Sequence, residues 1–290
     1  MKKIFFSLWI ALFLFAGCKT EEKKYDRIVV SIPPQAYIAR HLLGEDAAIT
    51  TIIGSNTNPE TFEPAMNTMF TLMNSDVYFP VGTLEFEKKL IKNASLQKEG
   101  INVVDCSADG IKLLYGTHDD CDHSHGEHHH SGNMPDPHIW STPGNMSVIA
   151  QTMAAELCRL YPEKEEEIKA NLEKLQNRFG KLDSGMKNVL AANNVEAFMI
   201  WHPSLSYFAD TYNLEQINIG SGSKEASAKK IADRFGKASE KKAKVLFLQK
   251  EFDPAQTKPF VGDLNIRTVV INQMSEDWED EFIKMTEAFR

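Results

Sequence analysis

The sequence is poor in cysteine, has no excess of basic residues and lacks an apolar run long enough to cross a membrane. Four cysteines in 290 residues, without a paired spacing, exclude a fold built on disulfides. The formal net charge of −8 argues against a nucleic-acid partner, because phosphate groups need a basic face. The apolar run 4–15 is shorter than the roughly 20 residues of a transmembrane helix. What the chain does have is 42% hydrophobic residues, enough to fill one large domain or two ordinary ones.

The N-terminus has the pattern of a secretory signal. Two lysines precede the apolar run 4–15, and small residues follow it. Because Cys18 comes directly after Ala-Gly, the segment resembles a bacterial lipobox, in which the cysteine is acylated and becomes the mature N-terminus. We therefore predict a signal peptide over 1–17 and a polar tether over 18–25, with an ordinary signal peptide as the alternative. The mature protein is expected outside the cytoplasm, anchored to a bacterial membrane by its lipid.

Short apolar segments alternate with helical patterns through most of the mature chain. This alternation favours parallel α/β sheets. The predicted strands are 27–32, 48–53, 77–81 and 101–104 in the first half, and 196–201, 215–219, 245–249 and 267–271 in the second. Helical patterns between and after them include 36–43, 66–74, 227–235 and 277–289.

The middle of the chain differs, because apolar residues there recur at intervals of three and four. This stripe predicts one long helix that starts near Pro162, preceded by a shorter helix over 146–160. Its members are Ile168, Leu172, Leu175, Phe179, Leu182, Met186 and Val189. The predicted fold class is α/β, with two similar lobes, each a mostly parallel sheet flanked by helices, joined by one long rigid helix. The expected divisions are an N-terminal lobe 26–145, linking helices 146–192 and a C-terminal lobe 193–290.

Three potential metal ligands each follow an apolar segment. Glu60 lies in the turn after strand 48–53, His138 lies in Asp-Pro-His-Ile-Trp, and His202 ends the apolar strand 196–201. In α/β folds, ligands bind beyond the carboxyl ends of the strands. Taken one at a time, a surface acid is the more ordinary interpretation of Glu60, and a packed, hydrogen-bonded side chain is the more ordinary interpretation of each histidine.

The segment 117–134 holds six of the nine histidines, interspersed with acids. Imidazoles and carboxylates at this density suit borderline divalent metals, zinc above all. Because residues 118–130 offer no large apolar side chain to fold around, the segment is predicted to be a mobile loop inside the first lobe, and a spacer or a weak, non-specific metal binder is the alternative. The proposed auxiliary ligands are His118, His123, His125, His128, His129 and His130.

Taken together, the motifs resemble those of the zinc/manganese substrate-binding proteins of bacterial ABC importers, the ZnuA and TroA type. The resemblance covers essentially the whole mature chain. Segment 58–64, Asn-Pro-Glu-Thr-Phe-Glu-Pro, looks like the family's G-x-D-P-H-x-Y-E-P, and 136–140 matches its D-P-H-x-W. Segment 202–209 resembles H-x-x-x-x-Y-F-A, and 224–228 resembles G-K-E-P-S-A. A histidine-rich loop before D-P-H-x-W is typical of the zinc-type members.

The resemblance implies a ligand set in the cleft between the lobes. Glu60 stands where the family has its first histidine, and His138 and His202 match the second and third ligands. The family's fourth ligand is an acid near the C-terminus, for which Asp277 is the candidate and Glu276 or a water are competitors. A carboxylate in place of a histidine is still a competent zinc ligand and moves the site toward harder metals. We therefore expect Zn²⁺, with Mn²⁺ as the alternative.

The resemblance also implies the function. The protein is expected to be a monomer that delivers its ion to a membrane permease with a cytoplasmic ATPase, without catalysing a reaction. One alternative is a surface adhesin or metal-scavenging lipoprotein. A second is a zinc hydrolase, which needs a separate general base and a roomy cleft; the chain has no H-E-x-x-H motif.

Overall fold

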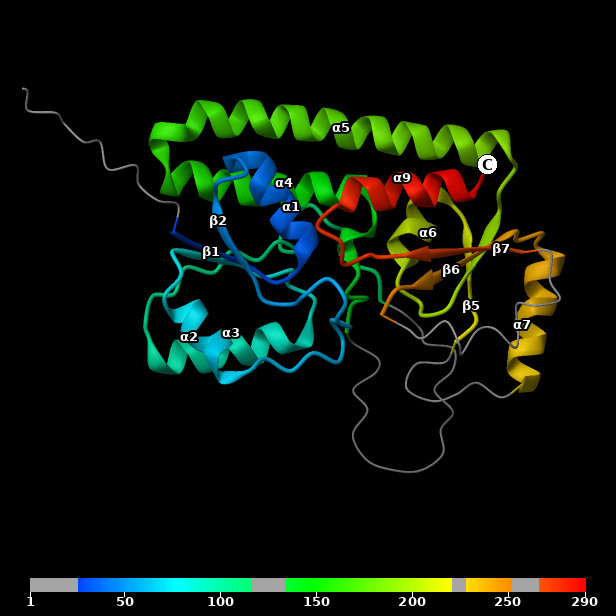
Figure 1. Cartoon of the computed structure of the whole chain (residues 1–290), viewed down its shortest axis with the longest axis horizontal. Coiled ribbons are helices and arrows are strands. Elements are labelled where there is room, and N and C mark those ends of the chain that lie inside the picture. The colour runs from blue at the N-terminus through cyan, green and yellow to red at the C-terminus, as the bar shows by residue number, and fades with distance from the viewer. Residues whose placement is uncertain (1–25, 116–133, 221–227, 252–265) are drawn as a thin grey trace, which may run out of the picture.

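Two parallel sheets, one in each lobe, lie under a long helix in the computed structural model, which describes residues 26–115, 134–220, 228–251 and 266–290 (Figure 1). The N-terminal sheet has the order β2-β1-β3 and the C-terminal sheet the order β5-β4-β6-β7. All of their strand pairs are parallel. The strands are β1 (Asp26–Val30), β2 (Ala48–Thr51), β3 (Val77–Phe79), β4 (Ala197–Ile200), β5 (Glu215–Asn218), β6 (Val245–Gln249) and β7 (Arg267–Ile271).

Seven of the eight predicted strands are confirmed, and the eighth is reduced to a bridge. Residues 101–104 pair with β3 only through Tyr78 and Val103. Tyr78 N–H donates to the Asn102 carbonyl and Val104 N–H donates to the Tyr78 carbonyl, each at 2.9 Å. The pairing direction was therefore predicted correctly, but the contact is too short to form a strand.

Helices cover the sheets and connect the lobes. Those of the N-terminal lobe are α1 (Pro33–Leu43), α2 (Met66–Met73) and α3 (Glu85–Gln97). The connection consists of η1 (Ile139–Ser141), α4 (Pro143–Leu160), η2 (Pro162–Lys164) and α5 (Glu165–Ala192). The C-terminal lobe has α6 (Ser206–Tyr212), α7 (Ala228–Glu240) and α9 (Trp278–Ala288). Helix α1 begins three residues before the predicted 36–43, because Pro33 and Pro34 suit a first turn in which N–H groups have no partner in the helix.

The long helix α5 runs along both lobes, with α4 and α9 beside it (Figure 1). Of the predicted apolar stripe, Ile168, Leu175, Phe179, Met186 and Val189 are buried, while the other two members are half-buried and pack on the same core. Three glutamates occupy the first turn of α5, where their negative charge interacts favourably with the helix dipole. The predicted fold class, two parallel α/β lobes and one long helix, is confirmed; the exact residue boundaries of the predicted domains stay a prediction.

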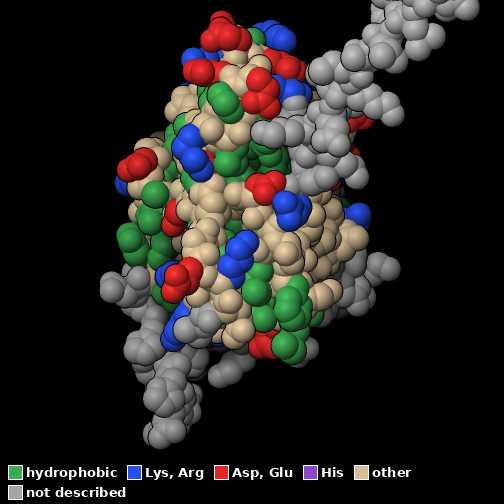
Figure 2. All heavy atoms as spheres, turned by 90° about the vertical axis from the view of Figure 1, so that its left-hand side faces the viewer, with side chains coloured by type: hydrophobic (Ala, Val, Ile, Leu, Met, Phe, Trp, Pro, Cys, Tyr) green, Lys and Arg blue, Asp and Glu red, His purple; other side chains and the backbone are tan. Residues whose placement is uncertain are grey.

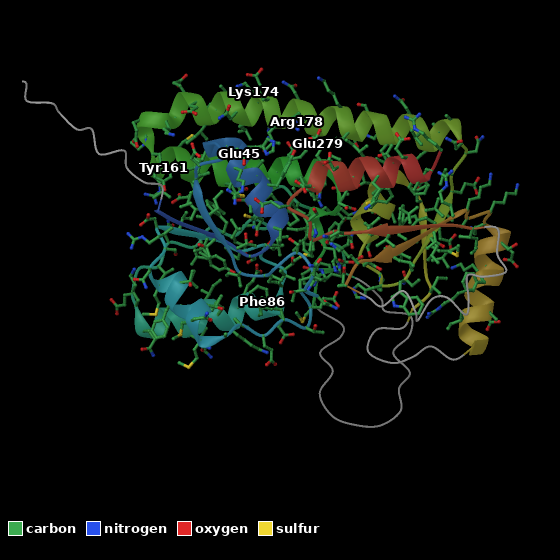
Figure 3. All side chains as sticks on the ribbon, in the orientation of Figure 1. Glu45, Phe86, Tyr161, Lys174, Arg178 and Glu279 are labelled. Atoms are coloured by element: carbon green, nitrogen blue, oxygen red, sulfur yellow. The ribbon has the colours of Figure 1, made fainter. Side chains whose placement is uncertain are left out.

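Two tryptophan side chains connect the lobes beneath α5 through hydrogen bonds. Trp140 Nε1 donates to the Gln273 carbonyl and Trp278 Nε1 donates to the Trp140 carbonyl, each at 3.0 Å. The Trp278 ring packs edge-on against Phe179 of α5, with ring centroids 5.6 Å apart. Figure 3 shows Arg178 on α5 and Glu279 on α9, and their side chains form an ion pair at 2.5 Å. The C-terminal helix is thereby fixed to both the connecting helix and the first lobe.

The outer end of the first lobe carries a mixed surface. Figure 2 shows side chains of both charges scattered over this face, with hydrophobic side chains gathered near its lower edge. In α2, Met66 is 74% exposed and Phe70 is 52% exposed. Within the described residues, every helix is too short or too polar to cross a membrane.

Candidate metal centre

Three side chains that are far apart in the sequence come together between the lobes. The ligand atoms of Glu60, His138 and His202 all lie within 4.8 Å of one another. Glu60 Oε1 is 3.5 Å from His138 Nε2 and 3.2 Å from His202 Nε2. Glu60 follows β2 and His138 precedes η1, both in the first lobe, whereas His202 follows β4 in the second. The three ligands predicted from the sequence therefore converge on one point.

Glu60 is held as a carboxylate that points at both imidazoles. Asn58 Oδ1 accepts the Glu60 backbone N–H at 2.8 Å and fixes the turn. Burial alone would raise the pKa of Glu60, but the hydrogen bond with His202 and the charges of His138 and His202 outweigh it and lower the pKa to about 2. The group is consequently ionised at neutral pH and attracts a cation.

His138 is oriented by a buried acid. Asp136 Oδ1 lies 2.9 Å from His138 Nδ1 and accepts the His138 backbone N–H at the same distance, which turns Nε2 toward the site. Only 4% of His138 is exposed. Burial opposes a charge on its ring, but the hydrogen bond with Asp136 and the charges of Asp136 and Glu60 raise the pKa of His138. This role of Asp136 was not predicted from the sequence, although its place two residues before the histidine was the available signal.

The segment around His138 is also tied to its surroundings through its carbonyls. Thr83 Oγ1 donates to the Pro137 carbonyl at 2.8 Å, and Tyr207 Oη donates to the Asp136 carbonyl at 2.9 Å. Since Tyr207 belongs to α6 of the second lobe, the loop that carries His138 is held from both sides. An imidazole fixed in this way needs little reorganisation to bind an ion.

His202 is positioned through its backbone by a buried glutamine. Gln249 Oε1 accepts the His202 N–H at 3.2 Å, and Gln249 Nε2 donates to the His202 carbonyl at 2.5 Å. Gln249 Nε2 also donates to Ser204 Oγ at 2.7 Å, and Ser204 Oγ donates to Gln273 Oε1. Because the Gln273 carbonyl accepts from Trp140, this polar chain continues to the segment of His138. Neither glutamine was predicted to support the site, because a polar residue near the end of a strand does not indicate its partner.

The C-terminal candidate Asp277 is not brought to the site. It is exposed, lies outside the three-residue group and precedes the first turn of α9. The reason is its neighbour Trp278, which is buried against Tyr37 and Phe179 and leaves Asp277 on the solvent side. The structure therefore does not bring Asp277 into this cluster, and its assignment as the fourth ligand stays a prediction. Cys18 and the auxiliary histidines between His118 and His130 lie outside the described residues, and their roles stay a prediction.

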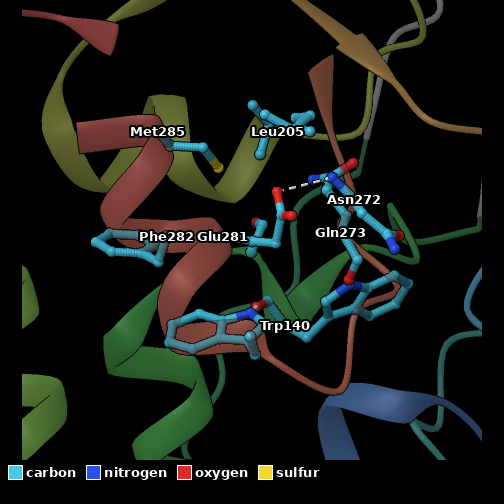
Figure 4. Close-up of a pocket in the computed structure, with 10 residues that line it drawn as sticks. Trp140, Leu205, Asn272, Gln273, Glu281, Phe282 and Met285 are labelled. Atoms are coloured by element: carbon cyan, nitrogen blue, oxygen red, sulfur yellow. Dashed lines mark hydrogen bonds between the residues drawn. The ribbon is translucent and has the colours of Figure 1, made fainter. Parts of the chain in front are cut away.

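A small cavity behind Trp140 is separate from the ligand cluster. It has a volume of about 20 Å³ and lies between η1, β7 and α9, so its residues are not the metal ligands. Figure 4 shows Trp140, Gln273 and Glu281 at its wall, with Asn272 N–H donating to Glu281 Oε2 at 3.0 Å. The volume suits about one water molecule.

The geometry of the three ligands fits a zinc ion. Zinc binds imidazole nitrogen and carboxylate oxygen at about 2.0–2.2 Å with tetrahedral angles, which places neighbouring ligand atoms roughly 3.3–3.6 Å apart. The distances of 3.2 Å and 3.5 Å from Glu60 Oε1 to the two Nε2 atoms are close to that range. One carboxylate and two imidazoles leave room for a fourth ligand.

The fold and the site together define a two-lobed α/β binding protein with a divalent-metal site between its lobes. A family model described as zinc-uptake complex component A, periplasmic, matches residues 28–289. The chain belongs to this family.

Individual relatives have low sequence identity to this chain. The chain is 26% identical over 294 residues to the zinc-binding lipoprotein AdcA of Streptococcus pneumoniae (strain ATCC BAA-255 / R6), a match that covers 97% of this chain and 57% of AdcA. It therefore spans little more than half the length of that relative.

Solved structures give the same fold. A crystal structure of a ZnuA deletion mutant with zinc bound has a TM-score of 0.76 at 25% identity and covers 90% of this chain and 95% of its own. A mutant structure of the laminin-binding adhesin Lmb of Streptococcus agalactiae has a TM-score of 0.75 at 17% identity, covering 91% and 99%. The likeness to Lmb shows a shared fold alone.

Proposed function

We propose that this protein binds Zn²⁺ between its lobes, outside the cytoplasm, and delivers the ion to the permease and ATPase of an ABC importer. The observation that carries the proposal is the convergence of Glu60, His138 and His202 from both lobes on one point. A site shared between lobes couples occupancy to their relative position, which is what a carrier needs in order to present a loaded form to a partner. The family's description as a zinc-uptake component supports the proposal.

Binding without reaction agrees with the groups around the ligands. A zinc hydrolase needs a general base that is separate from the ligand set. The acid nearest to His138 is Asp136, and its Oδ1 is occupied by the ring and backbone nitrogens of His138. Asp136 therefore orients a ligand and does not activate water.

The ligand set favours zinc and tolerates manganese. Two imidazoles suit a borderline metal, while the Glu60 carboxylate is a harder ligand that makes Mn²⁺ more acceptable than an all-histidine set would. Transition-metal affinities rise from Mn²⁺ toward Zn²⁺ for a given site, so zinc binds more tightly when both are present.

We extend the proposal to the membrane. In the sequence, Cys18 stands eight residues before the start of β1 at Asp26, so a lipid on Cys18 would hold the two-lobed body close to the bilayer. The relative AdcA is described as a lipoprotein, which supports this placement. A monomer on a short tether can meet its permease by diffusion in two dimensions. The only support for an adhesin role is the fold that this chain shares with Lmb.

The test compares the zinc affinity of the purified protein with that of two alanine variants. Each affinity is measured by competition with a chromophoric chelator. His202→Ala removes a ligand and is expected to weaken zinc binding at least tenfold, because the loss of a group that only orients a ligand already costs about 10–100-fold. His41→Ala is the matched control, because His41 lies on α1 and contacts the Tyr37 carbonyl and Arg178. Equal affinities for both variants and the unaltered protein would overturn the proposed site.

A further inference from the structure

The three-ligand cluster leaves a metal ion short of one ligand and one negative charge. Zinc in a closed site takes four ligands. A dication with Glu60 and two neutral imidazoles keeps a net charge of +1 within the ligand set, which the Asp136 carboxylate behind His138 offsets only from a distance, and burying charge without direct compensation is costly. A second carboxylate would fill the fourth position and bring the net charge of the site to zero.

The acidic side chains near the C-terminus either face solvent or already have other partners. Asp277 is exposed, and the three other acids that flank or begin α9 and could reach inward already have partners. These partners are Arg40 for Glu276, Tyr37 and Arg178 for Glu279, and Asn272 and Lys284 for Glu281. A carboxylate at the fourth position would therefore come from another element.

Glu251 lies beyond the carboxyl end of β6, at the same edge of the sheet as His202, and two residues further along than Gln249, which is level with His202. Strands β4 and β6 are parallel neighbours, with Ile200 beside Phe247. His202 comes two residues after the end of β4, and Glu251 comes two residues after the end of β6. Parallel strands end at the same edge of a sheet, so both residues emerge at the edge that bears the site. Gln249, which binds the backbone of His202, is two residues before Glu251 and fixes the two strand ends side by side.

The charges that act on Glu251 are those of the ligand cluster. Its side chain is half-buried, and this burial raises the pKa of Glu251. The charges of His202 and His138 act in the opposite direction, and that of Glu60 adds to the rise. The carboxyl group is thus within electrostatic reach of all three ligands, although it lies outside the group whose atoms are within 4.8 Å of one another. Repulsion from Glu60 disfavours a closer approach until a cation is present.

We propose that Glu251 is the fourth ligand of the metal, closing onto the ion by side-chain rotation when the site is filled. The inference rests on the proposed function, since it needs the ion to be bound by Glu60, His138 and His202. It gives a neutral site with two carboxylates and two imidazoles. The second carboxylate also makes the site harder and so raises the relative affinity for Mn²⁺.

The experiment compares Glu251→Gln with Asp277→Asn as the matched control, each titrated with zinc alone against a chromophoric chelator. The Glu251 variant keeps the shape of the side chain and loses its charge. We expect it to bind zinc at least tenfold more weakly than the unaltered protein, with Asp277→Asn unchanged. An affinity for Glu251→Gln within twofold of the unaltered protein would overturn the inference.

A spectroscopic measurement separates a ligand from a nearby charge. Cobalt(II) in a tetrahedral site absorbs visible light much more strongly than in a six-coordinate site, and the band shifts when a ligand is replaced. We expect the cobalt-loaded Glu251→Gln variant to differ in band position and intensity from the unaltered protein. A weaker affinity with an unchanged spectrum would show that Glu251 acts only through its charge, and would also overturn the inference.

The same titrations distinguish the two hypotheses. If His202→Ala binds zinc as well as the unaltered protein does, the proposed site itself fails. If His202→Ala loses affinity and Glu251→Gln does not, the site stands and only the assignment of its fourth ligand fails.

Discussion

The substitution Gln249→Leu removes the side chain that holds His202 in place and leaves every predicted ligand intact. Only 1% of Gln249 is exposed, and its amide makes three hydrogen bonds, two with the backbone of His202 and one with Ser204 Oγ. Leucine fills a similar volume without making any of them. The variant therefore tests whether the position of His202, and not only its presence, determines metal affinity.

The expected magnitudes follow from these bonds. Each buried hydrogen bond contributes about 1 kcal/mol net, so the loss of three lowers the free energy of unfolding by roughly 3 kcal/mol. Groups that orient a metal ligand are worth 10–100-fold in affinity, which corresponds to about 1.4–2.7 kcal/mol of binding free energy. The Ser204 hydroxyl keeps its bond to Gln273, so the rest of the polar chain remains in place.

Two measurements on the same protein check this reasoning. Urea unfolding of the metal-free form gives the stability change, and chelator competition gives the zinc affinity. Gln97→Leu is the matched control, because Gln97 is exposed at the end of α3, and it should change neither quantity appreciably. If Gln249→Leu loses the expected stability but binds zinc within twofold of the unaltered protein, then the glutamine supports the fold and does not position the ligand.

Two further outcomes are expected. Lowering the pH from about 7.5 to 5.5 should release zinc, because His138 must be neutral to bind it and the hydrogen bond and charge of Asp136, with the charge of Glu60, raise the pKa of His138, so that protons compete with the metal as the pH falls; constant affinity by chelator competition at both values would contradict a histidine site. Trp278→Phe should lower the free energy of unfolding by about 2–4 kcal/mol, because the buried Trp140 carbonyl loses a donor and the packing against Phe179 loses volume. A change under 0.5 kcal/mol in urea unfolding would show that the tryptophan contact is not what joins the lobes.

The sequence predicts the strands and the long helix well because their patterns are local. Buried parallel strands such as β4 and β6 are continuous apolar runs, and the stripe of α5 repeats over seven positions. Residues 101–104 show the limit of this reasoning, since an apolar run alone does not determine how many residues pair with a neighbour.

The candidate site is predictable only in part, because its ligands are set by motifs and its supports by tertiary contacts. Glu60, His138 and His202 were identified from the segments that precede them. Asp277 lies outside the cluster because the burial of the next residue, Trp278, decides which way it faces, and this burial cannot be read from the sequence around it. The role of Gln249 depends on the register between β4 and β6, which pairs Ile200 with Phe247 and cannot be read from either strand alone.

The tryptophan that joins the lobes also lies beside a metal ligand. The rings of Trp140 and His138 have centroids 5.3 Å apart, and the indole N–H of Trp140 is bonded to the second lobe. Indole emission responds to nearby charge and to the strength of such a bond. We therefore expect the tryptophan fluorescence of the protein to change when the ion binds or leaves, so that binding can be followed without any added dye.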